Sequence, residues 1–180
     1  MKKIVFFGGV KVERDSEMYA LAQGIAERVA RDDKVVITGG GGGIMEAANR
    51  GAYLSGGRSE GIGTTELAQK SNGFFSPGGY VEFSSMEARE RHLISEGDAF
   101  LFFPGGYGTL NELFAVLVSI RISKKSLVPV VLVGRSFWKE MLEWINRKLC
   151  GNGLITDRES KFVSSISDDM NEILEIIRCV

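Results

Sequence analysis

Several residue types that build catalytic or metal sites are scarce in this sequence. Its 180 residues include one histidine, His92, and two cysteines, Cys150 and Cys179. A single histidine leaves little material for a Ser-His-Asp triad or a histidine-rich zinc site, and His92 lies in a charged segment that favours a surface position. The two cysteines have no metal-binding or redox spacing, which favours a reducing compartment. We therefore expect no metal site and a cytoplasmic location.

The sequence also lacks an excess of charge and a long apolar run. It has 22 Lys and Arg against 23 Asp and Glu, a net charge of -1. This balance argues against a general nucleic-acid binder but leaves room for one local anion site. The apolar stretch of MKKIVFFGG ends at Gly8, too short for a signal peptide, and no run is long enough to span a membrane. We expect neither nucleic acid nor a membrane as a partner.

What the sequence does have is an alternation of apolar strands and amphipathic helices. We predict strands at 3–8, 34–38, 58–63, 81–83, 98–103 and 127–133. We predict helices at 16–31, 44–55, from the Ser84-Ser85-Met86-Glu87 capping box to about 96, 109–122, 136–149, and over Met170, Ile173, Leu174 and Ile177. Segment 64–80 is expected to be a loop. This order predicts an α/β fold: a Rossmann-like, doubly wound parallel sheet with helices on both faces, formed by 1–180 as one domain.

Glycine is abundant, and it gathers where the predicted strands end. Three strands run into glycines, at 8–9, 39–43 and 105–108. In a parallel sheet, ligands bind beyond the carboxyl ends of the strands, near the switch in strand order. Free N-H groups at a helix N-terminus, with no Cβ in the way, form an anion site. One such loop would be explained by a tight turn alone, but two loops that run into helices at one edge favour a phosphate-bearing ligand.

The motifs of the common nucleotide-binding enzymes are absent. After the first strand the chain has GGVKVERD, which does not fit the dinucleotide fingerprint, and no Gly-Lys-Ser/Thr tripeptide forms a P-loop. Lys124 and Lys125 follow a helix end, where they more simply interact with the helix dipole than form a Schiff base. Nothing therefore indicates NAD or ATP hydrolysis, and we expect no cofactor.

The glycine motifs resemble those of a known family. PGGYGTLNE (104–112) resembles the PGGxGTxxE signature of the Lonely Guy family, the cytokinin-activating phosphoribohydrolases, which older labels call lysine decarboxylases. GGGGGIMEAANRGA (39–52) is similar to the second motif of that family. The segments 85–106 and 129–145 resemble the family's sequences on either side of the signature, so the resemblance extends from about Ile4 to Ile177.

The resemblance implies hydrolysis of the N-glycosidic bond of a nucleoside 5'-monophosphate. The substrate would be AMP or N6-substituted AMP (a cytokinin nucleotide), and the products would be the free base and ribose 5-phosphate. The residues that the family pattern assigns are Arg89 and Glu112 for catalysis, Gly105, Gly106, Gly108 and Thr109 for the phosphate, and Gly41, Gly43, Met45 and Glu46 for the base or ribose. The chain departs from the pattern at Glu90, where the family commonly has lysine, and at Gly42, where it usually has proline.

Two interpretations of Glu112 remain open. Breaking a glycosidic bond builds positive charge on the ribose ring, which a carboxylate one turn beyond a phosphate loop can stabilise. Alternatively, Thr109 and Glu112 form a capping box, with Thr109 as the N-cap. The function has an alternative as well, a non-catalytic nucleotide-binding sensor or carrier of the same fold. At Gly106 we expect any Cβ to block both the backbone conformation and the approach of phosphate.

The segment 110–122 is apolar nearly all round. A helix of this kind must be buried on most sides, and its own sheet can cover only one face. Together with the resemblance, this predicts a homodimer. The apolar residues are Leu110, Leu113, Phe114, Ala115, Val116, Leu117, Val118, Ile120 and Ile122.

Overall fold

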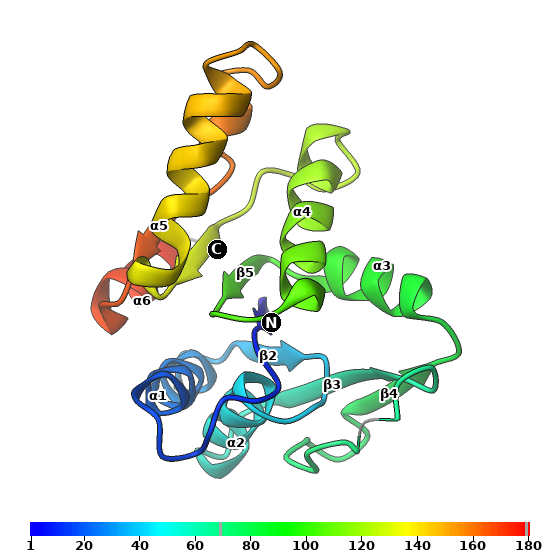
Figure 1. The fold of residues 1–180 in the computed structure, drawn as a ribbon. Helices are drawn as coiled ribbons and strands as arrows, with labels where there is room; N and C mark the ends of the chain where they lie inside the picture. Colours follow the sequence, from blue (N-terminus) through cyan, green and yellow to red (C-terminus); the bar gives the residue numbers. More distant parts are fainter. Residues whose placement is uncertain (69, 179) are drawn as a thin grey trace.

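Seven parallel strands form one sheet (Figure 1). The computed structural model describes residues 1–68, 70–178 and 180, so Cys179 lies outside the described residues. The strands are β1 (Lys3–Phe7), β2 (Val35–Thr38), β3 (Ser59–Thr64), β4 (Tyr80–Phe83), β5 (Ala99–Phe102), β6 (Val130–Val133) and β7 (Ser165–Ser167). Their order is β4-β3-β2-β1-β5-β6-β7, and every neighbouring pair is parallel.

Helices cover both faces of this sheet. They are α1 (Glu17–Arg31), α2 (Ile44–Leu54), α3 (Met86–Glu96), α4 (Tyr107–Arg121), α5 (Arg135–Trp144) and α6 (Met170–Arg178). Helices α1, α2 and α6 pack on one face, and helices α3, α4 and α5 pack on the other. Figure 1 shows this for α1 with α2 and for α3 with α4. The predicted Rossmann-like α/β fold is confirmed. None of the helices within the described ranges is long and apolar enough to cross a bilayer.

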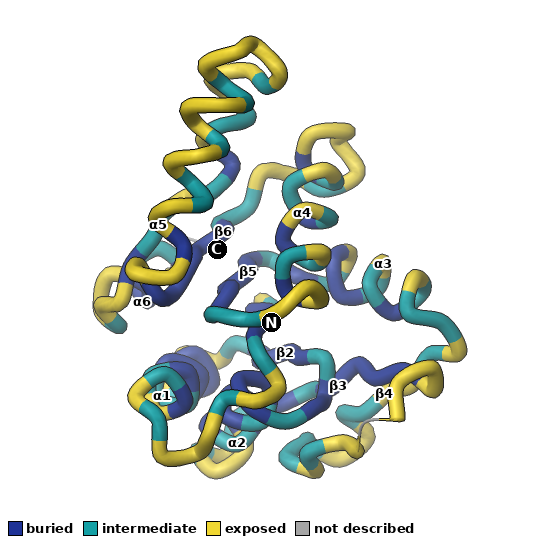
Figure 2. The backbone as a smooth tube through the Cα atoms, in the orientation of Figure 1, coloured by how far each residue is buried: buried dark blue, intermediate teal, exposed yellow. Residues whose placement is uncertain are grey.

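The central strands are apolar on both sides because both faces of the sheet are covered. In β1, Ile4 and Phe6 pack under α1 and α6, whereas Val5 and Phe7 pack under the opposite layer. Figure 2 shows the result: the inner strands are buried and the exposed residues lie on the outer sides of the helices and in the loops. This burial makes the sheet a rigid base for the loops that follow its strands.

The switch in strand order lies between β1 and β5. From β1 the chain builds outward to β4, then returns through α3 and adds β5 on the other side of β1. The glycine loops meet at this point: the Gly9 N-H donates to the Pro104 carbonyl (2.9 Å), and the Ile44 N-H donates to the Gly9 carbonyl (3.1 Å). The loops after β1, β2 and β5 are therefore joined at one edge, as expected for a ligand site.

Several element boundaries differ from the prediction. The fourth helix begins at Tyr107 rather than 109, with Gly106 as its N-cap. The predicted strand 127–133 begins only at Val130, because Pro129 has no N-H to add to the ladder. The helix 136–149 changes from α to π geometry at Ile145 and continues so to Cys150, and the three-residue strand β7 was not predicted. A strand this short carries no periodic signal.

Candidate active site

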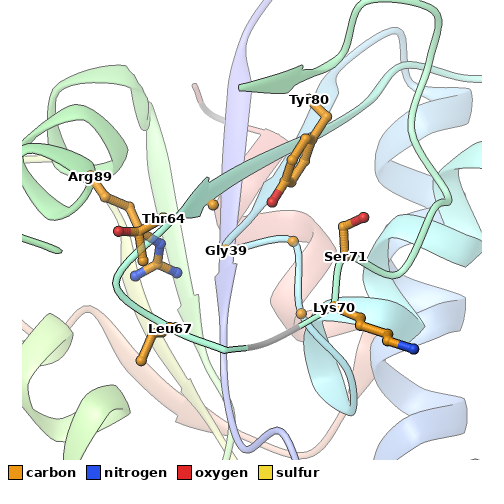
Figure 3. A pocket seen from close by; sticks show the side chains of 10 residues that line it. Gly39, Thr64, Leu67, Lys70, Ser71, Tyr80 and Arg89 are labelled. Carbon is orange, nitrogen blue, oxygen red and sulfur yellow. The ribbon is translucent and has the colours of Figure 1, made fainter. Parts of the chain in front are cut away.

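Arg89 of α3 and Glu112 of α4 form an ion pair beside the switch point. The Arg89 Nη1 donates to Glu112 Oε1 over 3.3 Å, and Nε donates to the Ile62 carbonyl at 2.8 Å. Arg89 is only 5% exposed. In Figure 3 its side chain extends from α3 toward Thr64, at the end of β3. Because two anchors hold the guanidinium, its position relative to the carboxylate is well defined.

Gly39 makes room for this guanidinium. A Cβ at Gly39 would collide with the Arg89 guanidinium, and it would lie 2.9 Å from the Met45 sulfur. The first glycine of the 39–43 loop therefore serves the close approach of Arg89 to the end of β2 rather than a turn. The two family-like motifs are thus in physical contact through Arg89.

The Glu112 carboxylate lies in a poorly solvated position. Its side chain is 14% exposed. Burial raises the pKa of Glu112 to about 7, although the Arg89 guanidinium acts in the opposite direction, and the Glu90 carboxylate adds to the rise. An acid with a pKa near neutral can exchange a proton at physiological pH, which is a common property of catalytic carboxylates.

The capping interpretation of Glu112 is wrong. Since α4 begins at Tyr107, Thr109 is the third residue of the helix and not its N-cap. Glu112 therefore lies a full turn inside the helix, and its side chain contacts Arg89 instead. Gly106 has no side chain that could cap the helix, so no side chain caps the N-H groups of the first turn. The same geometry that removes the capping role leaves these donors free to bind an anion.

The glycines of the 105–108 loop have different roles. A Cβ on Gly105 would collide with the Thr109 hydroxyl, which folds back against the loop. At Gly106 and Gly108 a Cβ would meet no protein atom within 4 Å. The Gly106 backbone has φ -90° and ψ -157°, which any residue adopts, so the expectation that it needs the freedom of glycine is wrong. Side chains at Gly106 and Gly108 would therefore hinder only a bound ligand or another molecule.

A cleft of about 210 Å³ separates this loop from the ion pair. Gly106, Gly108 and Thr109 line one part of it, and Arg89 and Glu112 line another. The apolar wall comes from Met45, Leu67 and Met86. The cleft therefore combines N-H donors for an anion, one acid with an arginine, and an apolar surface suited to a flat ring.

The other predicted site residues lie around this cleft rather than in it. Gly41 lines a much smaller cavity with Thr64, Tyr80 and Arg89 (Figure 3). Gly43 and Glu46 line a separate, open depression between α2 and the loop after β1. There the Glu46 carboxylate accepts hydrogen bonds from Arg14 (2.7 Å) and Tyr19 (3.0 Å). Of the four residues predicted for the base or ribose, the structure brings only Met45 to the cleft with Glu112.

Sequence reasoning missed the residues that hold the 39–43 loop in place. The Asn72 N-H donates to the Gly40 carbonyl, and its side chain donates to the Gly41 carbonyl and to Asn49 Oδ1, each at 2.9 Å. Asn49 is fully buried and also accepts from Thr38 Oγ1 at 2.6 Å. An asparagine on the apolar face of α2 is a usable signal for such a network. Asn72 lies in an aperiodic segment and gives none.

The described residues contain no cluster of side chains typical of a metal site. Throughout residues 1–68, 70–178 and 180, no group of three or more His, Cys, Asp or Glu side chains could hold a metal ion. The one histidine packs its ring against Phe83, with 5.0 Å between the ring centroids, and does not line the cleft. The charged side chains that line the cleft are those of Arg89 and Glu112.

Comparison with known sequences gives a consistent family match. The model of a family described as "Possible lysine decarboxylase" matches residues 45–177. An uncharacterized protein of Archaeoglobus fulgidus is 31% identical over 137 residues, which cover 74% of this chain and 87% of the relative. A rice protein named probable cytokinin riboside 5'-monophosphate phosphoribohydrolase LOGL9 is 27% identical over 161 residues, which cover 89% of this chain and 71% of the relative.

Comparison with solved structures confirms the fold over the whole chain. The structural genomics target TM1055 has a TM-score of 0.76 and 23% identity, with full coverage of both chains. The molybdenum cofactor binding protein of Rippkaea orientalis has a TM-score of 0.71 and 20% identity, with 99% of this chain and 96% of that chain covered. At these identities the likeness establishes the shared fold alone.

Proposed function

This chain belongs to the family described as possible lysine decarboxylases, and from that premise we propose that it is a nucleoside 5'-monophosphate phosphoribohydrolase. Its substrate is AMP or an N6-substituted AMP (a cytokinin nucleotide), which it hydrolyses to the free base and ribose 5-phosphate. The observation that carries the proposal is the buried Arg89–Glu112 pair facing an uncapped, glycine-rich helix N-terminus across one cleft. Curated relatives with phosphoribohydrolase names support it.

The phosphate is held at the start of α4. The backbone N-H groups of Gly106, Gly108 and Thr109, which line the cleft, are the donors, with the Thr109 hydroxyl as a further one. Gly105, predicted with them, does not line the cleft. Each hydrogen bond to a charged group contributes roughly 1.5–3 kcal/mol, and the helix dipole adds to the attraction. The open space beside Gly106 and Gly108 supports this role, because a phosphate needs room there that side chains would occupy.

The reaction takes place at Glu112. As the glycosidic bond breaks, positive charge develops on the ribose ring, and the ionised carboxylate stabilises it. The same carboxylate can accept a proton from the attacking water, since its pKa lies near 7, and this proton then goes to the nitrogen of the departing base. Arg89, anchored on the Ile62 carbonyl, orients Glu112 and lies close enough to the cleft to contact the departing base.

The alternative is a sensor or carrier that binds a nucleotide-like ligand without turnover. One structural relative is named as a molybdenum cofactor binding protein, which makes a carrier a concrete second candidate. The two functions share the phosphate site and differ at Glu112. A buried acid with a near-neutral pKa is typical of catalytic sites, so this residue favours the enzyme.

One assay separates the two functions. The purified protein is incubated with AMP, with an N6-substituted AMP and with adenosine, and free base is measured by chromatography. We expect base from the monophosphates and far less from adenosine, because adenosine cannot use the N-H donors of α4. Tight binding of AMP with no release of adenine would instead establish a binding protein.

We also propose that the chain forms a homodimer through the outer face of α4. Phe114, Val118 and Ile122 on this face are 42%, 49% and 50% exposed. Beside them, α4 and α5 border an apolar groove of about 150 Å³. A second copy would remove this surface from water. Light scattering should report a dimer or a multiple of it, and a monomer at micromolar concentration would contradict the proposal.

A cytoplasmic location stays a prediction.

A further inference from the structure

A second contact between α3 and α4 lies directly beside the catalytic pair. The Asn111 side-chain amide donates to the Glu90 carboxylate. Arg89 and Glu90, consecutive on α3, thus contact Glu112 and Asn111, consecutive on α4. The two helices are joined at the cleft by adjacent contacts, one ionic and one between a carboxylate and an amide. The second contact has no part in the chemistry described above.

This second contact holds a negative charge close to Glu112. A neighbouring like charge disfavours the ionised form of an acid, and Glu90 acts on Glu112 in this direction. Among the described residues, the charged groups that act on Glu112 are Arg89 and Glu90, with opposite effects and both from α3. The Asn111 side chain is neutral, and β3 contributes the neutral Ile62 carbonyl, which contacts Arg89. Burial is the main reason for the raised pKa of Glu112, and two adjacent residues of α3 then adjust it in opposite directions.

We infer that Glu90 is a positioning residue for the reaction: held by Asn111, its carboxylate places a like charge beside the Arg89–Glu112 pair and so shifts the pH range of hydrolysis. This inference rests on the proposed function. Glu90 does not line the cleft, so it acts through Glu112 and not on the substrate. Its charge adds to the effect of burial and increases the fraction of Glu112 that is protonated near neutral pH, where the group can both accept and return a proton.

The test uses Glu90→Gln, which removes the charge and keeps an oxygen that can accept from Asn111. Without the like charge, Glu112 ionises more easily, so its titration midpoint should fall by about half a pH unit. The acid limb of kcat/KM should move down with it, while turnover on the alkaline plateau stays at the wild-type level. At a pH one unit below the wild-type midpoint, the rate should rise about two- to threefold.

Glu87→Gln is the matched control. Glu87 lies on the same helix and loses the same charge, but its side chain is 81% exposed and faces Arg91. It should leave the midpoint of Glu112 unchanged. Melting curves of both variants establish that the fold is intact, so a shift found only in Glu90→Gln cannot come from unfolding.

The titration is followed directly, by the ¹³C signal of the Glu112 side-chain carboxyl in each protein. This measurement does not need activity, so it judges Glu90 even if no base is released and the proposed function fails. A lower midpoint in Glu90→Gln alone supports the inference. An unchanged midpoint in Glu90→Gln, or an equal shift in Glu87→Gln, overturns it.

Discussion

Ion pairs lie at both ends of the parallel strands, and the carboxylates at the two ends differ in solvent exposure and in pKa. At the amino end of the strands, Lys3 pairs with Glu96, and Lys2 pairs with Asp98 over 3.2 Å. These carboxylates are about one-third exposed, at 30% and 33%. At the carboxyl end, the Arg89 and Glu112 side chains are 6% and 14% exposed. The difference in solvent access changes what each pair does.

The pKa values of the acids move in opposite directions. The Lys3 ammonium, through its hydrogen bond, lowers the pKa of Glu96. Burial alone would raise the pKa of Asp98, but hydrogen bonds from the Lys3 N-H and the Lys2 ammonium lower it overall. For Glu112 burial dominates, and its pKa rises to about 7. Partners and water stabilise the charged form at the amino end, whereas the carboxyl end disfavours it, which is typical of a functional site.

The largest expected effect is on turnover in Glu112→Gln. Removing the charge while keeping the size should lower turnover by about 10²- to 10⁴-fold, the range for losing a positioned acid-base group. The melting temperature should change little, because the glutamine oxygen can still accept from Arg89. Steady-state rates at saturating AMP and a melting curve are the measurements. Glu96→Gln, the same change at the amino end, is the control and should keep wild-type turnover.

The next effect concerns nucleotide affinity in Gly106→Val. Since a Cβ at Gly106 meets no protein atom and the backbone is extended, the protein should fold normally. The side chain would occupy the phosphate position, and the loss of one charged hydrogen bond corresponds to about a 10- to 100-fold weaker affinity for AMP. Calorimetry with adenosine as the second ligand is the check. If both ligands lose affinity equally, the loop is only a turn.

A smaller effect is expected on stability, with opposite pH dependence at the two ends. Glu96 and Asp98 have lowered pKa values in the folded protein, so their ionised forms stabilise the fold at any pH above their ordinary pKa values. This stabilisation is lost as the pH falls through the lowered pKa values of the folded protein. Glu112 has a raised pKa, so the stability linked to its protonated form is complete below its ordinary value and is lost as the pH rises toward 7.

The ion pairs at the amino end test the predicted direction of the pH dependence of stability. Glu96→Gln with Asp98→Asn should reduce the free energy of unfolding at neutral pH by about 1 kcal/mol, the scale of partly exposed pairs. The difference from wild type should shrink as the pH falls into the acid range. Denaturant unfolding at several pH values is the measurement. A difference that grows on acidification would show that these pairs do not stabilise the fold.

Much of the fold could be predicted because its signals are local. The strand burial, the helix periodicity and the glycines at strand ends each depend on residues close in sequence. The start of α4 was misplaced because Thr109 and Glu112 have the spacing of a capping box, and only the packing of α3 decides that Glu112 contacts Arg89. The partners of Glu46, namely Arg14 and Tyr19, come from a distant loop and helix. Such long-range contacts have no signature in a single sequence.

We propose that one cleft holds the phosphate on the start of α4 and places the ribose against residue 112. A crystal structure of Glu112→Gln with AMP tests it most directly, because the variant should bind the nucleotide without consuming it. We predict the phosphate on the N-H groups of Gly106, Gly108 and Thr109, and the ribose C1' beside Gln at position 112 and the Arg89 guanidinium. A nucleotide bound elsewhere, such as the depression beside Glu46, would contradict the account.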